Sequence, residues 1–165
     1  MNILVLCTGN SARSILAEAI FNELGEGKVT AFSAGSKPVG AVNPTALHLL
    51  KAKGYDVSSF RSKSWDEFSG DGAVDLDIVL TVCGNAAGET CPVWIGAPIT
   101  AHWGFPDPAG VDGPDGVKLA AFRQVYKVLR NNIAELLALD PAYMNPEDLH
   151  RVMLEIHSAN SPVQF

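Results

Sequence analysis

A short run of large aliphatic residues, Ile3-Leu4-Val5-Leu6, stands almost at the start of the chain and leads directly into a polar loop. An apolar run without alternation is typical of a strand buried on both faces, as in a parallel sheet. Residues 11–24 then repeat their apolar side chains at helical spacing, and Gly25 and Gly27 end this pattern. The chain therefore begins as strand, loop and helix, the opening of an α/β unit.

The patterns that follow continue this alternation. Strands are predicted at 29–34, 77–82 and 99–103; helices are predicted at 44–53, at 118–139 and from Asn145 onward, with a short helix opening at Ser64. Strands that alternate with helices predict an α/β fold. We expect a three-layer sandwich, in which a four-stranded parallel sheet carries helices on both faces.

The charge and hydropathy of the chain argue against several classes of partner. The net charge is −6, with 12 Lys and Arg against 18 Asp and Glu, so nucleic acid and anionic membranes are poor partners. No apolar run reaches the length of a membrane span, and the first residues predict a strand rather than an export signal. We therefore expect a cytoplasmic protein, in which cysteines are more often catalytic or metal-binding than structural.

The loop after the first strand is the candidate anion site. Its backbone N–H groups and the positive N-terminus of the next helix can surround a tetrahedral oxyanion, and the planar guanidinium of Arg13 can grip two oxygens. The same positive field is expected to lower the pKa of the Cys7 thiol and make it a nucleophile. The alternative is a buried structural Cys7 and a surface Arg13, but that interpretation does not explain the other residues of the loop or their spacing. The loop reads Cys7-Thr8-Gly9-Asn10-Ser11-Ala12-Arg13-Ser14.

Two further cysteines flank a segment of small and polar residues. Cys83 follows the third predicted strand, which places it at the same sheet edge as Cys7, and seven residues separate it from Cys91. Glycines make this segment easy to move, and a loop that carries one thiol to Cys7 and another to Cys83 makes a disulfide relay. A buried structural Cys83 and a metal site are the alternatives. The metal site is weaker, because the spacing is not that of zinc sites and His102 is the only nearby nitrogen ligand.

Asp107 lies between Pro106 and Pro108, directly after the fourth predicted strand. The prolines fix the backbone and keep the carboxyl group at the edge where the cysteines lie. When a thiolate attacks an oxyanion, a carboxylic acid can protonate the oxygen that leaves. A structural turn is an equal alternative, because Asp beside Pro is common in turns.

Three motifs together resemble the arsenate reductases built on the low-molecular-weight protein tyrosine phosphatase fold. They are the loop Cys7–Ser14, the pair Cys83 and Cys91, and the segment His102-Trp103-Gly104-Phe105-Pro106-Asp107-Pro108-Ala109. The resemblance covers about residues 1–139. It implies a phosphatase-like catalytic domain over residues 1–140. Residues 141–165 lie beyond the resemblance, and we expect them to form a C-terminal helical extension that packs on the core or on a partner chain.

The resemblance implies reduction of arsenate to arsenite, as in arsenic detoxification, through a relay of thiols. Cys7 attacks arsenate held by the loop and Arg13, while Asp107 acts as general acid. Cys83 then attacks Cys7 and releases arsenite, and Cys91 passes the disulfide outward. No bound cofactor is implied. The external reductant is thioredoxin, or glutaredoxin with glutathione.

The resemblance also assigns roles within the loop. Ser14 is expected to form a hydrogen bond with the thiolate, and Asn10 is expected to brace the loop. The implied substrate-binding residues are Thr8, Gly9, Asn10, Ser11, Ala12, Arg13 and Ser14.

Two features depart from the best-known thioredoxin-coupled members. Their last two cysteines are more closely spaced, which leaves the electron donor open between thioredoxin and glutaredoxin. Some of those members hold potassium with an acidic residue, where this chain has the basic segment Ser58–Lys63. A Lys or Arg there repels a cation and can pair with Glu18, so we predict no bound metal ion.

A low-molecular-weight tyrosine phosphatase, which hydrolyses phosphate monoesters through a phosphocysteine, is the neighbouring alternative. Such enzymes usually carry a second cysteine where this chain has Ala12, and an aromatic ring where it has Ala109; hydrolysis also needs no relay pair. A non-enzymatic anion-binding or thiol-sensing module is the second alternative, and it leaves Asp107 unexplained.

Overall fold

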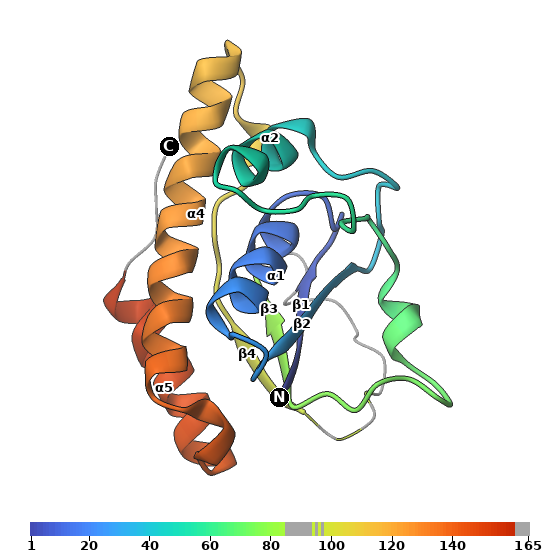
Figure 1. Ribbon diagram of the computed structural model, residues 1–165, viewed down its shortest axis with the longest axis vertical. Helices are drawn as coiled ribbons and strands as arrows, with labels where there is room; N and C mark the ends of the chain where they lie inside the picture. The colour runs from blue at the N-terminus through green and yellow to red at the C-terminus, as the bar shows by residue number, and fades with distance from the viewer. Residues whose placement is uncertain (85–93, 95, 97, 161–165) are drawn as a thin grey trace.

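One parallel sheet organises the molecule, whose computed structural model describes residues 1–84, 94, 96 and 98–160. Its strand order is β2-β1-β3-β4, and every neighbouring pair is parallel (Figure 1). The predicted four-stranded parallel sheet is therefore confirmed. The strands are β1 (Asn2–Cys7), β2 (Thr30–Gly35), β3 (Ile78–Thr81) and β4 (Ile99–His102).

The helices follow the predicted order with shifted starts. The first begins at Arg13 rather than Ser11, because the residues before Arg13 form the loop. The long helix begins at Asp115 rather than Lys118, with Pro114 as its N-cap residue. Within the described residues, the α-helices are α1 (Arg13–Leu24), α2 (Pro44–Ala52), α4 (Asp115–Ala138) and α5 (Pro146–Ala159), and 3₁₀ helices lie at Trp65–Phe68, Pro108–Gly110 and Pro141–Tyr143.

Side chains of β1 alternate between two cores, which explains why the strand is apolar throughout. Ile3 and Val5 belong to the larger core, on the side of α1 and α4, and Cys7 ends the same row. Leu4 and Leu6 face the smaller core, where Phe68 of a 3₁₀ helix covers the sheet. Both faces of the strand are thereby buried.

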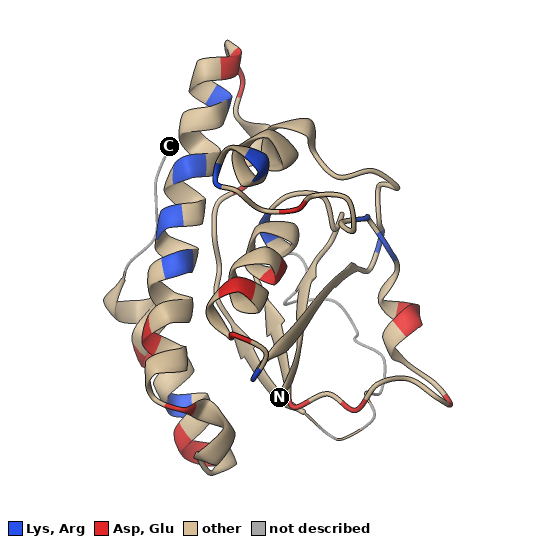
Figure 2. Cartoon of the chain, in the orientation of Figure 1, with Lys and Arg blue, Asp and Glu red and all other residues tan. Residues whose placement is uncertain are grey.

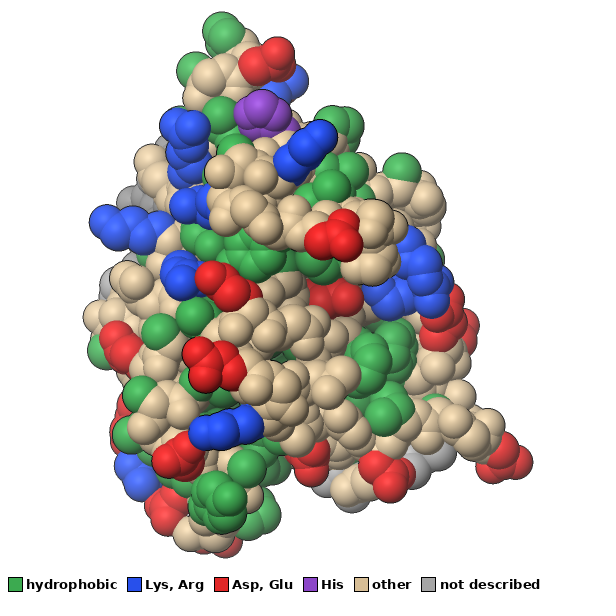
Figure 3. All heavy atoms as spheres, in the orientation of Figure 1, with side chains coloured by type: hydrophobic (Ala, Val, Ile, Leu, Met, Phe, Trp, Pro, Cys, Tyr) green, Lys and Arg blue, Asp and Glu red, His purple; other side chains and the backbone are tan. Residues whose placement is uncertain are grey.

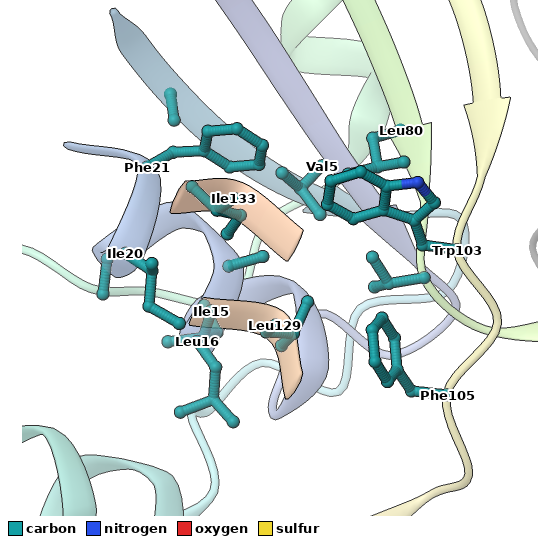
Figure 4. Close-up of a cluster of buried hydrophobic side chains, with 14 of the residues drawn as sticks. Val5, Ile15, Leu16, Ile20, Phe21, Leu80, Trp103, Phe105, Leu129 and Ile133 are labelled. Carbon is teal, nitrogen blue, oxygen red and sulfur yellow. The ribbon is translucent and has the colours of Figure 1, made fainter. Parts of the chain in front are cut away.

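The amphipathic face predicted for α4 is the one that packs on the sheet. Leu129 and Ile133 are fully buried, and they lie against Ile15, Leu16 and Val5 in the larger core (Figure 4). Burial of each such side chain contributes about 1.5–3 kcal/mol. This packing fixes α1, and with it the loop that α1 follows.

The C-terminal helix α5 packs against β4 and α4 (Figure 1). Its buried residues are Leu149, Met153 and Ile156. The indole N–H of Trp103, just beyond β4, donates a buried hydrogen bond to the Met153 carbonyl oxygen at 2.8 Å. Within the described part of the chain, no helix is long and apolar enough to span a membrane.

The topology brings the candidate residues to one edge of the sheet. Cys7 ends β1, which pairs with β3 on one side, and Cys83 follows β3 by two residues. His102 ends β4, the next strand, and Asp107 lies on the segment that continues from it. Parallel strands end on the same side, so the sheet alone places these groups at a common edge.

Candidate active site

The loop Cys7–Ser14 connects the carboxyl end of β1 to α1, and its outer carbonyl oxygens accept hydrogen bonds from neighbouring backbone N–H groups. These bonds run from Lys37 to Thr8, from Val39 to Gly9 and from Asn43 to Ser11, at 2.9, 3.0 and 2.9 Å. A carbonyl that points outward turns the N–H of the same peptide unit the other way. The loop is thus tied from outside and offers N–H groups to its interior.

The N-terminus of α1 opens into the same loop. Its N-cap residue is Ala12, whose side chain makes no capping hydrogen bond. The first-turn N–H groups of a helix have no partner inside the helix, and here no N-cap side chain occupies them. Together with the helix dipole, they favour an anion at this position.

Asn10 is the internal brace of the loop. It is fully buried and adopts a left-handed backbone conformation, with φ of 45°. Its side-chain amide donates to the hydroxyl oxygens of Ser14 and Ser33, each at 2.9 Å, and its side-chain oxygen accepts from the Lys63 backbone N–H at 2.9 Å. One residue therefore joins the loop to α1, β2 and the segment before the first 3₁₀ helix.

A charged pair continues this network. The Ser33 hydroxyl donates to the Glu18 carboxylate, and the Lys63 ammonium lies 3.8 Å from Glu18 Oε2. Burial raises the pKa of Glu18 and lowers that of Lys63, and each charge partly offsets the effect on the other. Arg61 instead pairs with Glu67, at 2.8 Å. Of the two cations considered for Glu18, Lys63 is the one that reaches it.

Arg13 crosses the mouth of the loop. Its Nη1 donates to the Phe105 carbonyl oxygen at 2.8 Å, and its Nη2 lies 3.3 Å from Asp107 Oδ1. Among the described residues, the buried Nε of Arg13 has no hydrogen-bond partner. Nε and Nη2 form the side fork of a guanidinium, which matches two oxygens of a tetrahedral anion. The Phe105 carbonyl thus holds one nitrogen and leaves this fork toward the site.

Asp107 stands next to that fork. It is half exposed, whereas the Arg13 side chain is only 13% exposed. One carboxyl oxygen accepts from the Ala109 backbone N–H at 3.2 Å, in the cap of the following 3₁₀ helix. The capping bond fixes the carboxyl group while leaving it open to solvent and to a bound anion, as a general acid requires.

Two cysteine sulfurs lie inside the site, those of Cys7 and Cys83, and both residues are buried. The Thr8 backbone N–H donates to Cys83 Sγ at 3.4 Å, and the Thr8 hydroxyl lies 3.6 Å from the same sulfur. Cys83 also forms a hydrogen bond with Cys7. The predicted proximity of Cys7 and Cys83 is thus observed, whereas Cys91 and most of the segment between it and Cys83 lie outside the described residues.

The expected lowering of the Cys7 pKa is wrong for this state of the protein. The hydrogen bond to Cys83, followed by burial and the charge of Cys83, raises the pKa of Cys7. The predicted positive contributions exist: Arg13 and the Gly9 backbone N–H both lower the pKa, but they are outweighed. The sequence predicted the positive groups around the Cys7 thiol and placed Cys83 nearby, but it did not predict that Cys83 outweighs those groups in setting the pKa of Cys7.

Several groups that build the site carry no motif of their own. Ser33 is a buried polar residue within β2, and that interruption of an apolar strand is the signal that points to it. Phe105 acts through its backbone carbonyl, which no residue type encodes. Ser14 is buried and accepts from Asn10, so its predicted bond to the Cys7 thiolate remains a prediction.

The anion site is local rather than part of a basic surface. Basic side chains gather along α4, away from the loop, and acidic ones are spread over the whole ribbon, including the first turn of α4 (Figure 2). The face in Figure 3 carries both signs of charge with hydrophobic side chains between them. Attraction for an oxyanion therefore comes from Arg13 and from backbone N–H groups.

Comparison with known proteins points to one family. The family model for low molecular weight phosphotyrosine protein phosphatase matches residues 2–151 and so extends past residue 139, the limit that the motifs indicated. The chain is similar to an arsenate reductase of Halalkalibacterium halodurans, with 40% identity over 74% of this chain and 85% of the relative. It is 31% identical to a glutaredoxin arsenate reductase of Synechocystis sp., over 82% and 95% of the two chains.

A solved structure agrees with these relatives. It is described as an arsenate reductase in the phosphate binding state, and it superposes with a TM-score of 0.64 at 29% identity. The match covers 84% of this chain and 97% of that one. The predicted fold and family resemblance are thereby confirmed.

We predict that replacing Cys83 with Ala lowers the pKa of Cys7. The substitution removes the largest cause of the raised pKa and leaves the contributions of Arg13 and Gly9. While the pKa stays above 7, the thiolate fraction of Cys7 at pH 7 should rise about tenfold for each unit by which the pKa falls. The rate of alkylation by iodoacetamide should rise with it, by about threefold per unit, because a thiolate of lower pKa is a weaker nucleophile. Alkylation followed by peptide mass spectrometry between pH 5 and 10 measures this, with Cys91→Ala as the matched control. An unchanged or higher pKa in Cys83→Ala contradicts the explanation.

Proposed function

The chain belongs to the low molecular weight phosphotyrosine protein phosphatase family, and we propose that within this family it is an arsenate reductase that works through a thiol relay. The observation that carries the proposal is a second sulfur beside the oxyanion loop: Cys83 accepts a hydrogen bond from Thr8 and contacts Cys7. A phosphatase needs one thiol here, because water resolves its phosphocysteine. A reductase needs a second thiol within reach of the first.

The first step is attack on arsenic. Arsenate binds to the loop N–H groups and to the side fork of Arg13. Cys7 sulfur forms a bond to arsenic while its thiol proton passes to an arsenate oxygen. An As–O bond breaks, and Asp107 donates a proton so that the hydroxyl group leaves as water. The 3.3 Å between Asp107 Oδ1 and Arg13 Nη2 supports this role, because an oxygen bound to the fork would lie next to the carboxyl group.

The second step transfers the electrons. Cys83 attacks Cys7 as a thiolate, so that the S–S bond forms and the S–As bond breaks. The electron pair of the broken bond remains on arsenic, which becomes arsenite. Cys91 then attacks Cys83, frees Cys7 and leaves a Cys83–Cys91 disulfide. An external dithiol supplies the electrons for the next cycle.

The donor and the compartment follow from the relay. We propose thioredoxin, or glutaredoxin with glutathione, as the transient partner; one relative is named a glutaredoxin arsenate reductase. A relay that is reset by an external thiol donor works in a reducing compartment, so we place the protein in the cytoplasm. Nucleic acid and membrane are not proposed as partners.

Phosphatase chemistry is the alternative within the family. The loop, Arg13 and Asp107 suit a phosphate ester as well as arsenate, so slow hydrolysis of a small aryl phosphate is compatible with the proposal. Ala109 provides no ring to stack on a phosphotyrosine, and hydrolysis gives Cys83 no role.

A trapping experiment tests the relay. We expect Cys91→Ser to accumulate a Cys7–Cys83 disulfide on incubation with arsenate, because the third thiol is missing. Mass spectrometry of non-reduced peptides detects the bond, and the same variant without arsenate is the control. Free thiols at both positions after arsenate exposure rule out the relay.

We further propose that the protein binds no structural potassium. The residues around Glu18 do not suit a cation, because the Lys63 ammonium already lies 3.8 Å from its carboxylate. The side chain of Lys63 is 8% exposed, so its charge is not easily displaced into solvent. Potassium and sodium chloride at equal ionic strength should therefore give the same melting temperature. A distinctly higher melting temperature in potassium, measured by calorimetry, contradicts this.

A further inference from the structure

The Phe105 carbonyl, which orients Arg13, belongs to a short segment held on two sides. On one side it continues the sheet: the backbone N–H groups of Trp103 and Phe105 donate to the carbonyl oxygens of Thr81 and Val82, at 2.8 and 3.2 Å. On the other side lies α5. The position of the Phe105 carbonyl thus depends on both neighbours.

The contacts from α5 are specific. The Met153 carbonyl accepts the Trp103 indole N–H at 2.8 Å. The ring of His157 stacks on Trp103, with centroids 6.3 Å apart and planes at 19°, and meets the edge of Phe105 at 5.3 Å. Trp103 and Phe105 are both buried and point into the core formed with α4 (Figure 4).

His157 is itself held in place. The side-chain amide of the fully buried Asn132, on α4, lies 3.4 Å from His157 Nδ1. Burial, followed by the nearby His102, lowers the pKa of His157, against an opposing contribution from the Gly104 backbone. The ring is therefore uncharged near neutral pH and packs as an aromatic group.

We propose that α5 is a positioning element of the active site, acting through His157 on Trp103 and Phe105 and from there on Arg13. The chain of contacts is continuous, since His157 packs on Phe105 and the Phe105 carbonyl holds Arg13 Nη1 at 2.8 Å. His157 touches no substrate. It fixes the direction of the side fork that receives the oxyanion, and to that extent the inference rests on the proposed function.

Binding of inorganic phosphate to the full-length protein tests this without turnover. We expect His157→Ala to weaken phosphate binding about tenfold, as loss of supporting contacts does at other built sites. His150→Ala, an exposed histidine on the same helix, is the matched control and should leave the affinity unchanged. Isothermal titration calorimetry measures each affinity.

A double-mutant cycle separates positioning from a general loss of structure. In an Arg13→Lys background the guanidinium fork is gone, so His157→Ala should cause no further loss of phosphate affinity. Equal losses in both backgrounds, or unchanged affinity in His157→Ala, overturn the proposal.

A second substitution covers the case in which His157→Ala does not fold. His157→Phe keeps an aromatic ring against Trp103 and Phe105, but it leaves the buried Asn132 amide without its partner. We expect near-native phosphate affinity together with a lower melting temperature, since an unpaired buried polar group costs about 1–3 kcal/mol. Weakened phosphate binding in a folded His157→Phe variant contradicts a positioning role for the ring.

The outcomes also separate this inference from the proposed function. If arsenate is not reduced but His157→Ala weakens phosphate binding only when Arg13 is present, the function fails and the inference stands. If arsenate is reduced but the His157→Ala substitution does not change phosphate affinity, the proposed function stands and the inference fails.

Discussion

A loop that turns its N–H groups inward must be held in shape by its surroundings, and the Asn10 side chain is the brace at its centre. Its buried amide group uses both donor hydrogens and its oxygen, and these bonds reach α1, β2 and Lys63. A buried polar group left unpaired costs about 1–3 kcal/mol, so loss of the Asn10 side chain would destabilise its contacts with α1, β2 and Lys63 at the same time. Gly35 meets the same constraint from β2: a Cβ there would lie 3.0 Å from the Cys7 carbonyl oxygen and closer still to that of Thr8.

The geometry of Arg13 follows from this frame. The guanidinium is fixed at Nη1 by a backbone carbonyl, and its remaining fork lies between the loop and Asp107. Because the carbonyl belongs to a segment packed on α5, the anion site extends beyond the loop. The two cysteines have opposed effects on the chemistry: the contact that brings Cys83 within reach of Cys7 also raises the pKa of Cys7, which Arg13 lowers. We infer that arsenate, held by Arg13 and the loop, engages a thiol that is protonated in the resting protein.

The sequence predicted what local patterns and strand ends can encode. Hydrophobic patterning alone predicted the strand β1 and the buried face of α4, and the residue types after β1 predicted the loop. Cys7, Cys83 and Asp107 could be placed together because parallel strands end at one edge of the sheet. The sign of the Cys7 pKa shift was not predictable, since it depends on a balance between Arg13 and a sulfur from a distant strand. Phe105 acts through its backbone, and His157 acts through contacts more than fifty residues away in sequence, so neither leaves a local signature.

The central claim is that arsenate is reduced by electrons from the protein's own thiols. Fully reduced protein, freed of external thiols and mixed with excess arsenate, tests it most directly by parallel assays of arsenite and of free thiols. The account predicts one arsenite for each chain, matched by the loss of two thiols. Absence of arsenite, or arsenite formed with all thiols still free, would contradict it.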